Sequence, residues 1–397
     1  MPVTDEQVAA VVRDAAERVP AFAGRLRAAG LAAADVRGVD DLTALPVLTK
    51  DDVLELQRQD PPFGGLLATD AAPVRLFQSP GPIYEPQLPG PDPWRWRDAL
   101  TACGMDSSDV LLNCFSYHLS PAGAMFESAA RSLGCAVVPG GVGNLDLQAQ
   151  AIGDLGITAF TGLPSYLNSL IDRYHAAGLD PARWRLTKAL TTAEPLPDDL
   201  RAQLERQVPV VRMAYGTAET GLLGYEVEAG AGLMVPSGVL VQVCDLDTGE
   251  PIERGEGQVV VTLLRADYPL VRFGTGDLSA WTTGPDGQRR LVGVLGRVGA
   301  AVKVRGMFLH PRQVTAAMRD LPGVSRYRFV IDRIDHRDEL RCEVVAHAET
   351  AVEQVSAAVR DRVKAGLRLT AEVDVVGHID GDDVLVDRRQ WHGTGSG

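Results

Sequence analysis

Three short motifs in the second half of the chain bring together residue types that can do chemistry. They are Ala214-Tyr215-Gly216-Thr217-Ala218-Glu219-Thr220, then Arg272-Phe273-Gly274-Thr275-Gly276-Asp277, and finally Gly296-Arg297 followed by Lys303-Val304-Arg305-Gly306. An aromatic ring can stack on a planar group. Carboxylates can hold a hard cation, and a basic cluster can bind an anion. Each motif alone is a weak signal, and their order and separation carry the information.

The elements that must position these motifs change character along the chain. Residues 95–200 alternate apolar strand patterns with helical patterns, which predicts βαβ units and a mostly parallel sheet. After about residue 230, short apolar strands joined by Gly and Asp turns predict antiparallel β structure. Near the start of the chain, Thr4 and Thr49 are predicted to cap helices that follow them directly.

We therefore expect an α/β fold with two domains. The large N-terminal domain, residues 1–297, should carry parallel sheets and a β-rich subdomain, and should bind the acyl group and the nucleotide of any ligand. A small, mobile α+β domain is expected over residues 298–390, followed by a disordered tail over residues 391–397.

Composition excludes several classes of protein. The 397 residues carry a net charge of −13, which argues against nucleic acid as a partner. No apolar run reaches the roughly 18 residues of a membrane span, so no membrane association is expected. The five cysteines are scattered and contain no Cys-x-x-Cys pair, which favours reduced thiols in a cytoplasmic protein.

Taken in order, the three motifs resemble those of the adenylate-forming superfamily, which includes acyl-CoA ligases, adenylation domains and luciferases. Within it, the closest resemblance is to phenylacetate-CoA ligases, and it extends from about residue 10 to about residue 390. Three further segments support it: Leu45-Pro46-Val47-Leu48-Thr49-Lys50, Thr161-Gly162-Leu163-Pro164-Ser165-Tyr166 and Thr192-Ala193-Glu194-Pro195-Leu196.

The resemblance implies an enzyme that activates an aromatic or apolar carboxylate through an acyl-adenylate, a CoA thioester or both. ATP or AMP, Mg²⁺, and CoA or acyl-CoA are the implied cofactors, and a homodimer is a further expectation. The small domain is expected to rotate and close over a site in the cleft between the domains.

The resemblance also implies a role for each residue of the nucleotide site. Tyr215 matches the position that stacks on adenine, with Gly216 and Thr217 beside it, and Asp277 matches the carboxylate that binds the ribose. Glu194 lies in the loop that lines the adenine. Glu219 matches the carboxylate linked to the metal, and Arg297 the residue that contacts the nucleotide from the hinge. The plainer alternative is that Tyr215 and Asp277 are ordinary turn and core residues and that Arg297 is a surface arginine.

Two segments at strand ends are expected to form the acyl pocket, because aromatic and glycine-rich elements suit a flat apolar acid. The candidate lining residues are Phe115, Tyr117, Gly162, Pro164, Ser165 and Tyr166. His118 is expected to face the carboxylate or the reacting thioester, and a purely structural role for it stays open.

The parts that should handle phosphate depart from the family pattern. The family's phosphate loop ends in lysine, whereas residues 77–86 here contain three prolines, no lysine and the acidic Glu85, which together make a poor phosphate cradle. The C-terminal catalytic lysine should lie near residues 380–383, which read Asp-Gly-Asp-Asp. Arg272, Lys303 and Arg305 are the candidate substitute cations.

These departures leave three hypotheses open. The first is an ATP-driven acyl- or aryl-CoA ligase that uses substitute residues. The second is an enzyme on the same fold that uses a preformed acyl-CoA or acyl-AMP for acyl transfer, condensation or hydrolysis. The third is a non-catalytic binding protein.

Overall fold

The computed structural model describes residues 3–79, 82–298, 302–305, 307–309, 311–334, 337–347 and 350–389. The chain divides into two compact units, one that ends at Gly296 and one that begins at Arg297. The predicted tail, residues 391–397, lies outside the described residues. In the described part of the chain, no helix is both long and apolar enough to cross a membrane.

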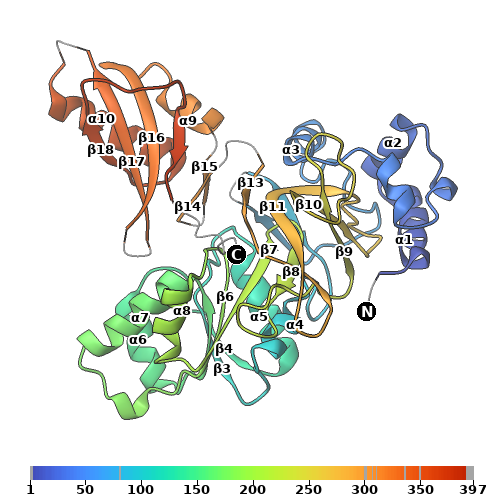
Figure 1. Cartoon of the computed structure of the whole chain (residues 1–397), viewed down its shortest axis with the longest axis horizontal. Helices are drawn as coiled ribbons and strands as arrows, with labels where there is room; N and C mark the ends of the chain where they lie inside the picture. The colour runs from blue at the N-terminus through green and yellow to red at the C-terminus, as the bar shows by residue number, and fades with distance from the viewer. Residues whose placement is uncertain are drawn as a thin grey trace. The chain divides into compact units, whose positions relative to one another are not determined.

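A six-stranded sheet forms the centre of the first unit, with the strand order β4-β3-β5-β6-β7-β8 (Figure 1). Every neighbouring pair is parallel except β7 and β8, which confirms the parallel sheet predicted from the alternating pattern. The strands are β3 (Val110–Asn113), β4 (Ala136–Val138), β5 (Ala159–Gly162), β6 (Lys188–Thr191), β7 (Val210–Thr217) and β8 (Gly221–Tyr225).

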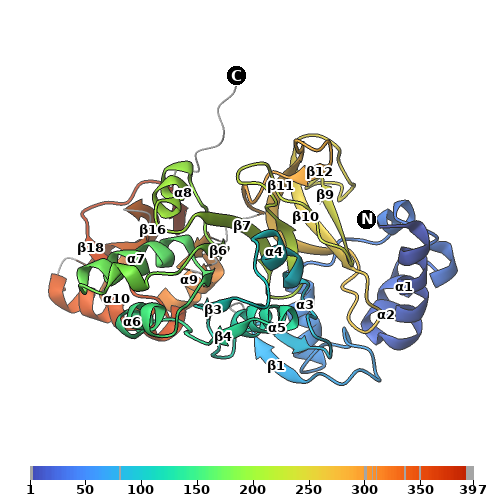
Figure 2. The ribbon, with the colours of Figure 1, turned by 90° about the horizontal axis from the view of Figure 1, so that it is seen from below.

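Helices cover both faces of this sheet because its strands are apolar on both sides. Leu111 of β3 packs in one core cluster with Phe126 of α5, and the next residue, Leu112, packs in another with Leu170 of α7. Figure 2 shows the two groups of helices around the strands. They are α4 (Trp96–Ala102) and α5 (Ala122–Leu133) on one face, and α6 (Leu145–Asp154), α7 (Pro164–Ala176) and α8 (Asp198–Glu205) on the other.

The second half of this unit is antiparallel, as the glycine and aspartate turns predict. β9 and β11 both pair antiparallel with β10, β12 pairs antiparallel with β11, and β13 also pairs with β11. These strands are β9 (Val239–Cys244), β10 (Glu256–Leu263), β11 (Phe273–Thr283), β12 (Arg289–Leu291) and β13 (Gly296–Arg297).

The N-terminal elements begin where the sequence places their caps. The side chains of Thr4 and Thr49 accept hydrogen bonds from the backbone of Gln7 and Asp52, and each forms a reciprocal capping box. The elements before the central sheet are α1 (Asp5–Arg18), α2 (Pro20–Ala28), α3 (Lys50–Gln59), β1 (Arg75–Gln78) and β2 (Tyr84–Gln87). Short 3-10 helices cover Ala33–Asp35, Asp40–Ala44 and Pro181–Arg183.

The second unit is an α+β sandwich of its own. Its main sheet has the order β18-β17-β16-β19, with β16 and β17 antiparallel and both outer pairs parallel. Val355, Val359 and Val363 lie on one face of α10 and pack in the core cluster with Phe329 of β16. The elements are β14 (Val302–Val304), β15 (Met307–Leu309), α9 (Pro311–Met318), β16 (Val324–Ile334), β17 (Arg337–Ala346), α10 (Val352–Leu367), β18 (Glu372–Val375) and β19 (Leu385–Asp387).

Candidate functional site

The first two motifs meet through a hydrogen bond between β7 and β11. The hydroxyl of Tyr215 donates to Asp277 Oδ2 at 2.9 Å and lies 3.2 Å from Thr275 Oγ1. Thr275 in turn donates to the carbonyl of Val259 at 3.1 Å, so the backbone fixes the group. All three side chains are buried. Two residues 62 positions apart along the chain therefore place a phenol hydroxyl against a buried carboxyl group.

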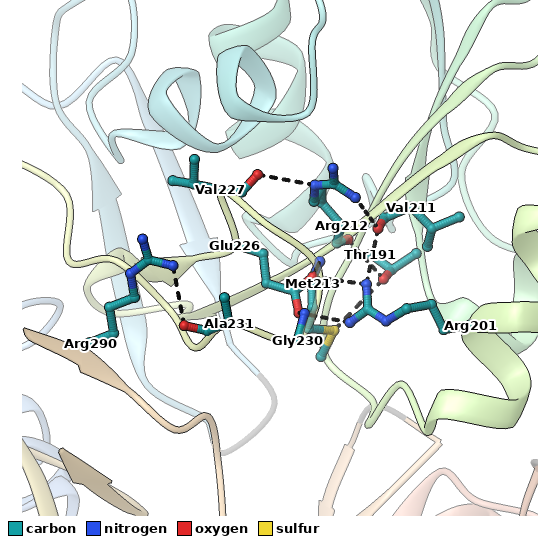
Figure 3. A network of polar contacts seen from close by, with 10 residues as sticks. All are labelled: Thr191, Arg201, Val211, Arg212, Met213, Glu226, Val227, Gly230, Ala231 and Arg290. Atoms are coloured by element: carbon teal, nitrogen blue, oxygen red, sulfur yellow. Dashed lines mark hydrogen bonds and ion pairs between the residues drawn. The ribbon is translucent and has the colours of Figure 1, made fainter. Parts of the chain in front are cut away.

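A network around Glu226 holds β7, the strand that carries Tyr215 (Figure 3). Arg201 of α8 donates to both oxygens of the Glu226 carboxylate, at 3.0 and 2.7 Å. The same carboxylate accepts from the backbone N–H groups of Met213 and Gly230 at 2.7 and 2.8 Å. Because these contacts tie α8, β7 and the chain after β8 to one buried group, they set the position of β7.

Gly216 adjoins Tyr215 and lies against the next strand. A Cβ at this position would lie 2.5 Å from the carbonyl oxygen of Gly221 and 2.7 Å from Trp96 Cζ2. The backbone oxygen cannot move without shifting β8. The close contact of β7 and β8 therefore requires glycine at position 216.

We expect Gly216→Ala to lower the free energy of unfolding by about 1–3 kcal/mol, because the new methyl group overpacks the strand pair. Urea unfolding followed by circular dichroism would measure it. Gly24→Ala is the matched control, since a Cβ there meets only the end of Arg27 at 3.9 Å in α2. An equal loss in both variants would contradict the strand-contact explanation.

Glu219, the candidate metal ligand, is paired with a lysine that the sequence analysis gave no role. Lys50 Nζ lies 2.6 Å from Glu219 Oε1, and the two side chains are 26% and 5% exposed. Burial alone would raise the pKa of Glu219, but the charge and hydrogen bond of Lys50 outweigh burial and hold that pKa below its ordinary value. A signal existed in the sequence: Lys50 follows the cap Thr49, and a cation in the first turn opposes the helix dipole.

A second buried carboxyl, Glu85, lies close to this pair. Burial raises the pKa of Glu85 well above its ordinary value, and the charge of Glu219 raises it further. The hydroxyl of Tyr268 donates to Glu85 Oε2 at 3.4 Å, whereas Glu85 Oε1 has no hydrogen-bond partner within the part of the chain described here. A cavity of about 20 Å³, lined by Glu219, Tyr268 and Arg95 among others, has room for about one water.

The segment expected to wrap the phosphates is a β-hairpin in the structure. β1 and β2 pair antiparallel, with Phe77 opposite Glu85 and Gln78 opposite Tyr84. The backbone N–H of Ser79 donates to the carbonyl of Ile83 at 2.8 Å. Residues 80 and 81 lie outside the described residues. The hairpin thus directs the Glu85 side chain into the protein, where it is 1% exposed.

We expect Glu85→Gln to stabilise the protein increasingly as the pH rises. Above its ordinary pKa of 4.5, Glu85 ionises in the unfolded chain while the raised pKa keeps it protonated in the folded chain. The folded state then binds more protons, so the wild-type protein loses about 1.4 kcal/mol of stability per pH unit until the folded pKa is reached.

The glutamine variant removes this titration, so its advantage over the wild type should grow as the pH rises above the ordinary pKa of 4.5. Urea unfolding at several pH values would measure it. Glu55→Gln, at a side chain that is 57% exposed, is the matched control and should show a flat difference. A flat difference for Glu85→Gln as well would contradict the buried protonated carboxyl.

The implied Mg²⁺ does not fit the residues around Glu219. Magnesium takes an octahedron of oxygen ligands, but one oxygen of Glu219 already accepts from the Lys50 ammonium. Burial favours the neutral form of Glu85, which is a poor ligand. Over the described residues, no group of three or more His, Cys, Asp and Glu side chains is arranged to hold a metal ion.

The candidate pocket residues gather at the carboxyl ends of β3, β5 and β6. Ser165 Oγ donates to Glu194 Oε2 at 2.6 Å, which joins the first turn of α7 to the loop after β6. Tyr166 donates to Gln148 Oε1 at 2.6 Å, and Tyr117 accepts from Asn113 Nδ2 at 2.8 Å. Ligands of open α/β sheets bind at this end of the strands.

The remaining pocket candidates supply apolar or close-packed surface. Phe115 stacks on Phe126 with ring centroids 4.5 Å apart, and Pro164 is buried at the start of α7. A Cβ on Gly162 would lie 2.4 Å from Phe160 Cζ, so this position accepts only glycine without a shift of the ring. His118 is exposed in the loop between β3 and α5.

The candidate substitute cations have partners of their own or lie outside the description. Arg272 is 2% exposed and donates to the carbonyl of Gly249 at 2.5 Å. Arg305 donates to Thr370 Oγ1 at 2.7 Å within the second unit. Lys303 lies on β14, and its side chain falls outside the described part; Arg297 lies on β13. A role of these residues in binding phosphate stays a prediction.

The acidic stretch that stands near the expected catalytic lysine is held by arginines of its own unit. Arg328 Nη1 donates to the carbonyl of Asp380 at 2.8 Å. Arg326 Nη2 lies 3.0 Å from Asp382 Oδ1. These contacts hold the stretch beside β16.

Comparison with known proteins shows which enzymes this chain is similar to. Residues 95–262 match the family model of AMP-binding enzymes. The chain is 29% identical over 363 residues to phenylacetate-coenzyme A ligase from Thermus thermophilus, covering 86% of this chain and 80% of that protein. It is 26% identical over 393 residues to phenylacetate-coenzyme A ligase from Escherichia coli, covering 92% and 88%. The chain is thus similar to AMP-binding enzymes over residues 95–262 and to phenylacetate-coenzyme A ligases over most of its length.

The superfamily fold is also evident from solved structures. A 2-hydroxyisobutyryl-CoA ligase in complex with 2-HIB-AMP and CoA superposes with a TM-score of 0.85 at 23% identity, covering 97% of this chain and 88% of that chain. This likeness confirms the fold class expected from the motifs.

Proposed function

We propose that this adenylate-forming protein is an acyl- or aryl-CoA ligase, which converts a small apolar or aromatic carboxylate to an acyl-adenylate and then to a CoA thioester. The observation that carries the proposal is the Tyr215–Asp277 pair, because it joins a ring for adenine to a carboxylate for the ribose at one buried place. Relatives that match over most of their length are phenylacetate-CoA ligases, which supports this reaction class.

The pocket residues support an apolar acid. Phe115 and Phe126 present a stacked aromatic pair beside β3, and Ser165 and Glu194 add a hydrogen-bonded polar edge. Such a mixture of apolar walls and a few fixed polar groups is typical of small-molecule sites. Phenylacetate and benzoate are the acids to test first.

Several finer expectations belong to this proposal. The free, buried state of Cys103, Cys114, Cys135, Cys244 and Cys342 supports a reducing, cytoplasmic location. Homodimer formation, rotation of the second unit and a nucleotide role for Arg297 stay predictions.

Acid-dependent exchange of pyrophosphate into ATP tests the proposal. Exchange that needs phenylacetate or benzoate, followed by thioester formation when CoA is added, is the expected result. Absence of exchange with every acid, while AMP and CoA still bind, would overturn the ligase proposal.

One observation favours a second candidate, an enzyme that uses a preformed acyl-CoA or acyl-AMP without ATP. The segment that resembles the phosphate loop carries the buried Glu85, and the region of the expected catalytic lysine carries Asp380, Asp382 and Asp383. The buried, neutral carboxyl of Glu85 supplies no positive charge for a phosphate, and the aspartates at the second place oppose the transfer of a polyphosphate. Turnover of benzoyl-CoA in the absence of ATP would support this candidate.

A further inference from the structure

An ammonium group lies against the Glu219 carboxylate in the first unit. Lys50 Nζ lies 2.6 Å from Glu219 Oε1, and the Glu219 side chain is only 5% exposed. Glu85, on β2, is 1% exposed, and its Oε2 atom accepts a hydrogen bond of 3.4 Å from the hydroxyl of Tyr268. Three chain segments far apart in sequence therefore bring one ammonium and two carboxyl groups together.

The ammonium of Lys50 neutralises the negative charge of Glu219, which a metal ion would otherwise neutralise. A divalent cation bound to Glu219 would lie beside this ammonium, and the two positive charges would repel each other in a place that water screens poorly. Lys50 is also the first residue of α3, so the capping box of Thr49 and Asp52 sets its position. The start of the helix thus fixes where the lysine meets Glu219.

We propose that Glu219 holds no divalent cation, and that the Lys50 ammonium takes the place of a metal at this carboxylate, so that an adenosine ligand binds without a protein-bound metal. That the ligand contains adenosine rests on the proposed function, whereas the pairing of Glu219 with an ammonium in place of a metal ion does not. The assignment of the carboxylate rests on the 2.6 Å contact between Lys50 Nζ and Glu219 Oε1.

Titration with Mn²⁺ alone, followed by electron paramagnetic resonance, tests the carboxylate directly. The wild-type protein is expected to leave the signal of free Mn²⁺ unchanged at equimolar metal. One bound ion per chain that disappears in Glu219→Gln would overturn the proposal, and this result does not depend on any catalytic activity.

The variant Lys50→Met tests the lysine. It leaves the Glu219 carboxylate without its ammonium partner, so the variant should gain one Mn²⁺ site, and Lys50→Met/Glu219→Gln should lose that site again. Lys188→Met is the matched control: its lysine lies 2.7 Å from Asp109 Oδ2 with side chains 23% and 3% exposed, but Asp109 is already hydrogen-bonded to Thr158 and to the Asp106 backbone. This control should gain no site. A folded Lys50→Met that also gains none would overturn the role of the lysine.

A second measurement needs only the wild-type protein, in case Lys50→Met does not fold. The dissociation constant of α,β-methylene ATP, measured by calorimetry, should agree within about twofold with and without EDTA. Weakening by about tenfold or more on metal removal would overturn the proposal. Failure of the ligase function alone would leave the Mn²⁺ result intact, so the two proposals fail in distinguishable ways.

Discussion

Asp277→Ala is expected to weaken AMP binding by about 10- to 100-fold. A hydrogen bond to a charged group contributes about 1.5–3 kcal/mol, and 1.4 kcal/mol corresponds to a factor of ten in affinity. Asp277 is 4% exposed, so no solvent-mediated contact replaces the lost carboxylate easily. Calorimetric titration of wild type and variant with AMP measures the change.

The comparison with 2′,3′-dideoxy-AMP decides whether Asp277 binds the ribose or only holds Tyr215. If the carboxylate accepts from the ribose hydroxyls, the wild-type protein prefers AMP over the dideoxy analogue and Asp277→Ala loses this preference. Tyr215→Phe is the matched control, because it removes the 2.9 Å hydrogen bond to Asp277 and keeps the ring. An equal preference for AMP in wild type and Asp277→Ala would contradict the ribose contact.

The second large effect is expected on stability. Arg201→Met should lower the free energy of unfolding by about 3–5 kcal/mol, because it leaves the Glu226 carboxylate as an uncompensated buried charge. The two side chains are 12% and 5% exposed, and the pair is bidentate. The expected loss is a large fraction of the 5–15 kcal/mol that stabilises a typical domain.

Arg201→Met/Glu226→Met should recover much of this loss, since removal of both charges leaves no buried ion. The matched control is Arg183→Met, whose ion pair with Asp154 is exposed and should contribute less than about 1 kcal/mol. Chemical unfolding of the variants measures each difference. A double variant less stable than Arg201→Met would contradict the explanation.

The buried network around Glu226 fixes the strand that carries Tyr215. The Glu226 carboxylate accepts from the backbone N–H of Met213 on β7, and Tyr215 follows two residues later on the same strand. Ile83 and Leu88, beside β2, pack in the same core cluster as Tyr215, so the strand and the hairpin also share apolar contacts.

The sequence by itself determined the elements whose formation is local. The helix caps Thr4 and Thr49, the alternation of strands and helices over residues 95–200 and the antiparallel strands after residue 230 follow from neighbouring residues, and the structure confirms them. The order of the three motifs along the chain also indicated a resemblance to adenylate-forming enzymes, and the similarity to AMP-binding enzymes and phenylacetate-coenzyme A ligases agrees with it.

Only the tertiary structure decided which charges meet. Lys50 and Glu219 are 169 residues apart, and Glu85 and Tyr268 are 183 apart, so no local pattern connects them. The sequence predicts Glu219 as a metal ligand and Arg272 as a substitute cation, but long-range packing pairs Glu219 with Lys50 and directs Arg272 to the carbonyl of Gly249. The partner of a buried charge depends on which elements pack against it, and that is a property of the folded chain.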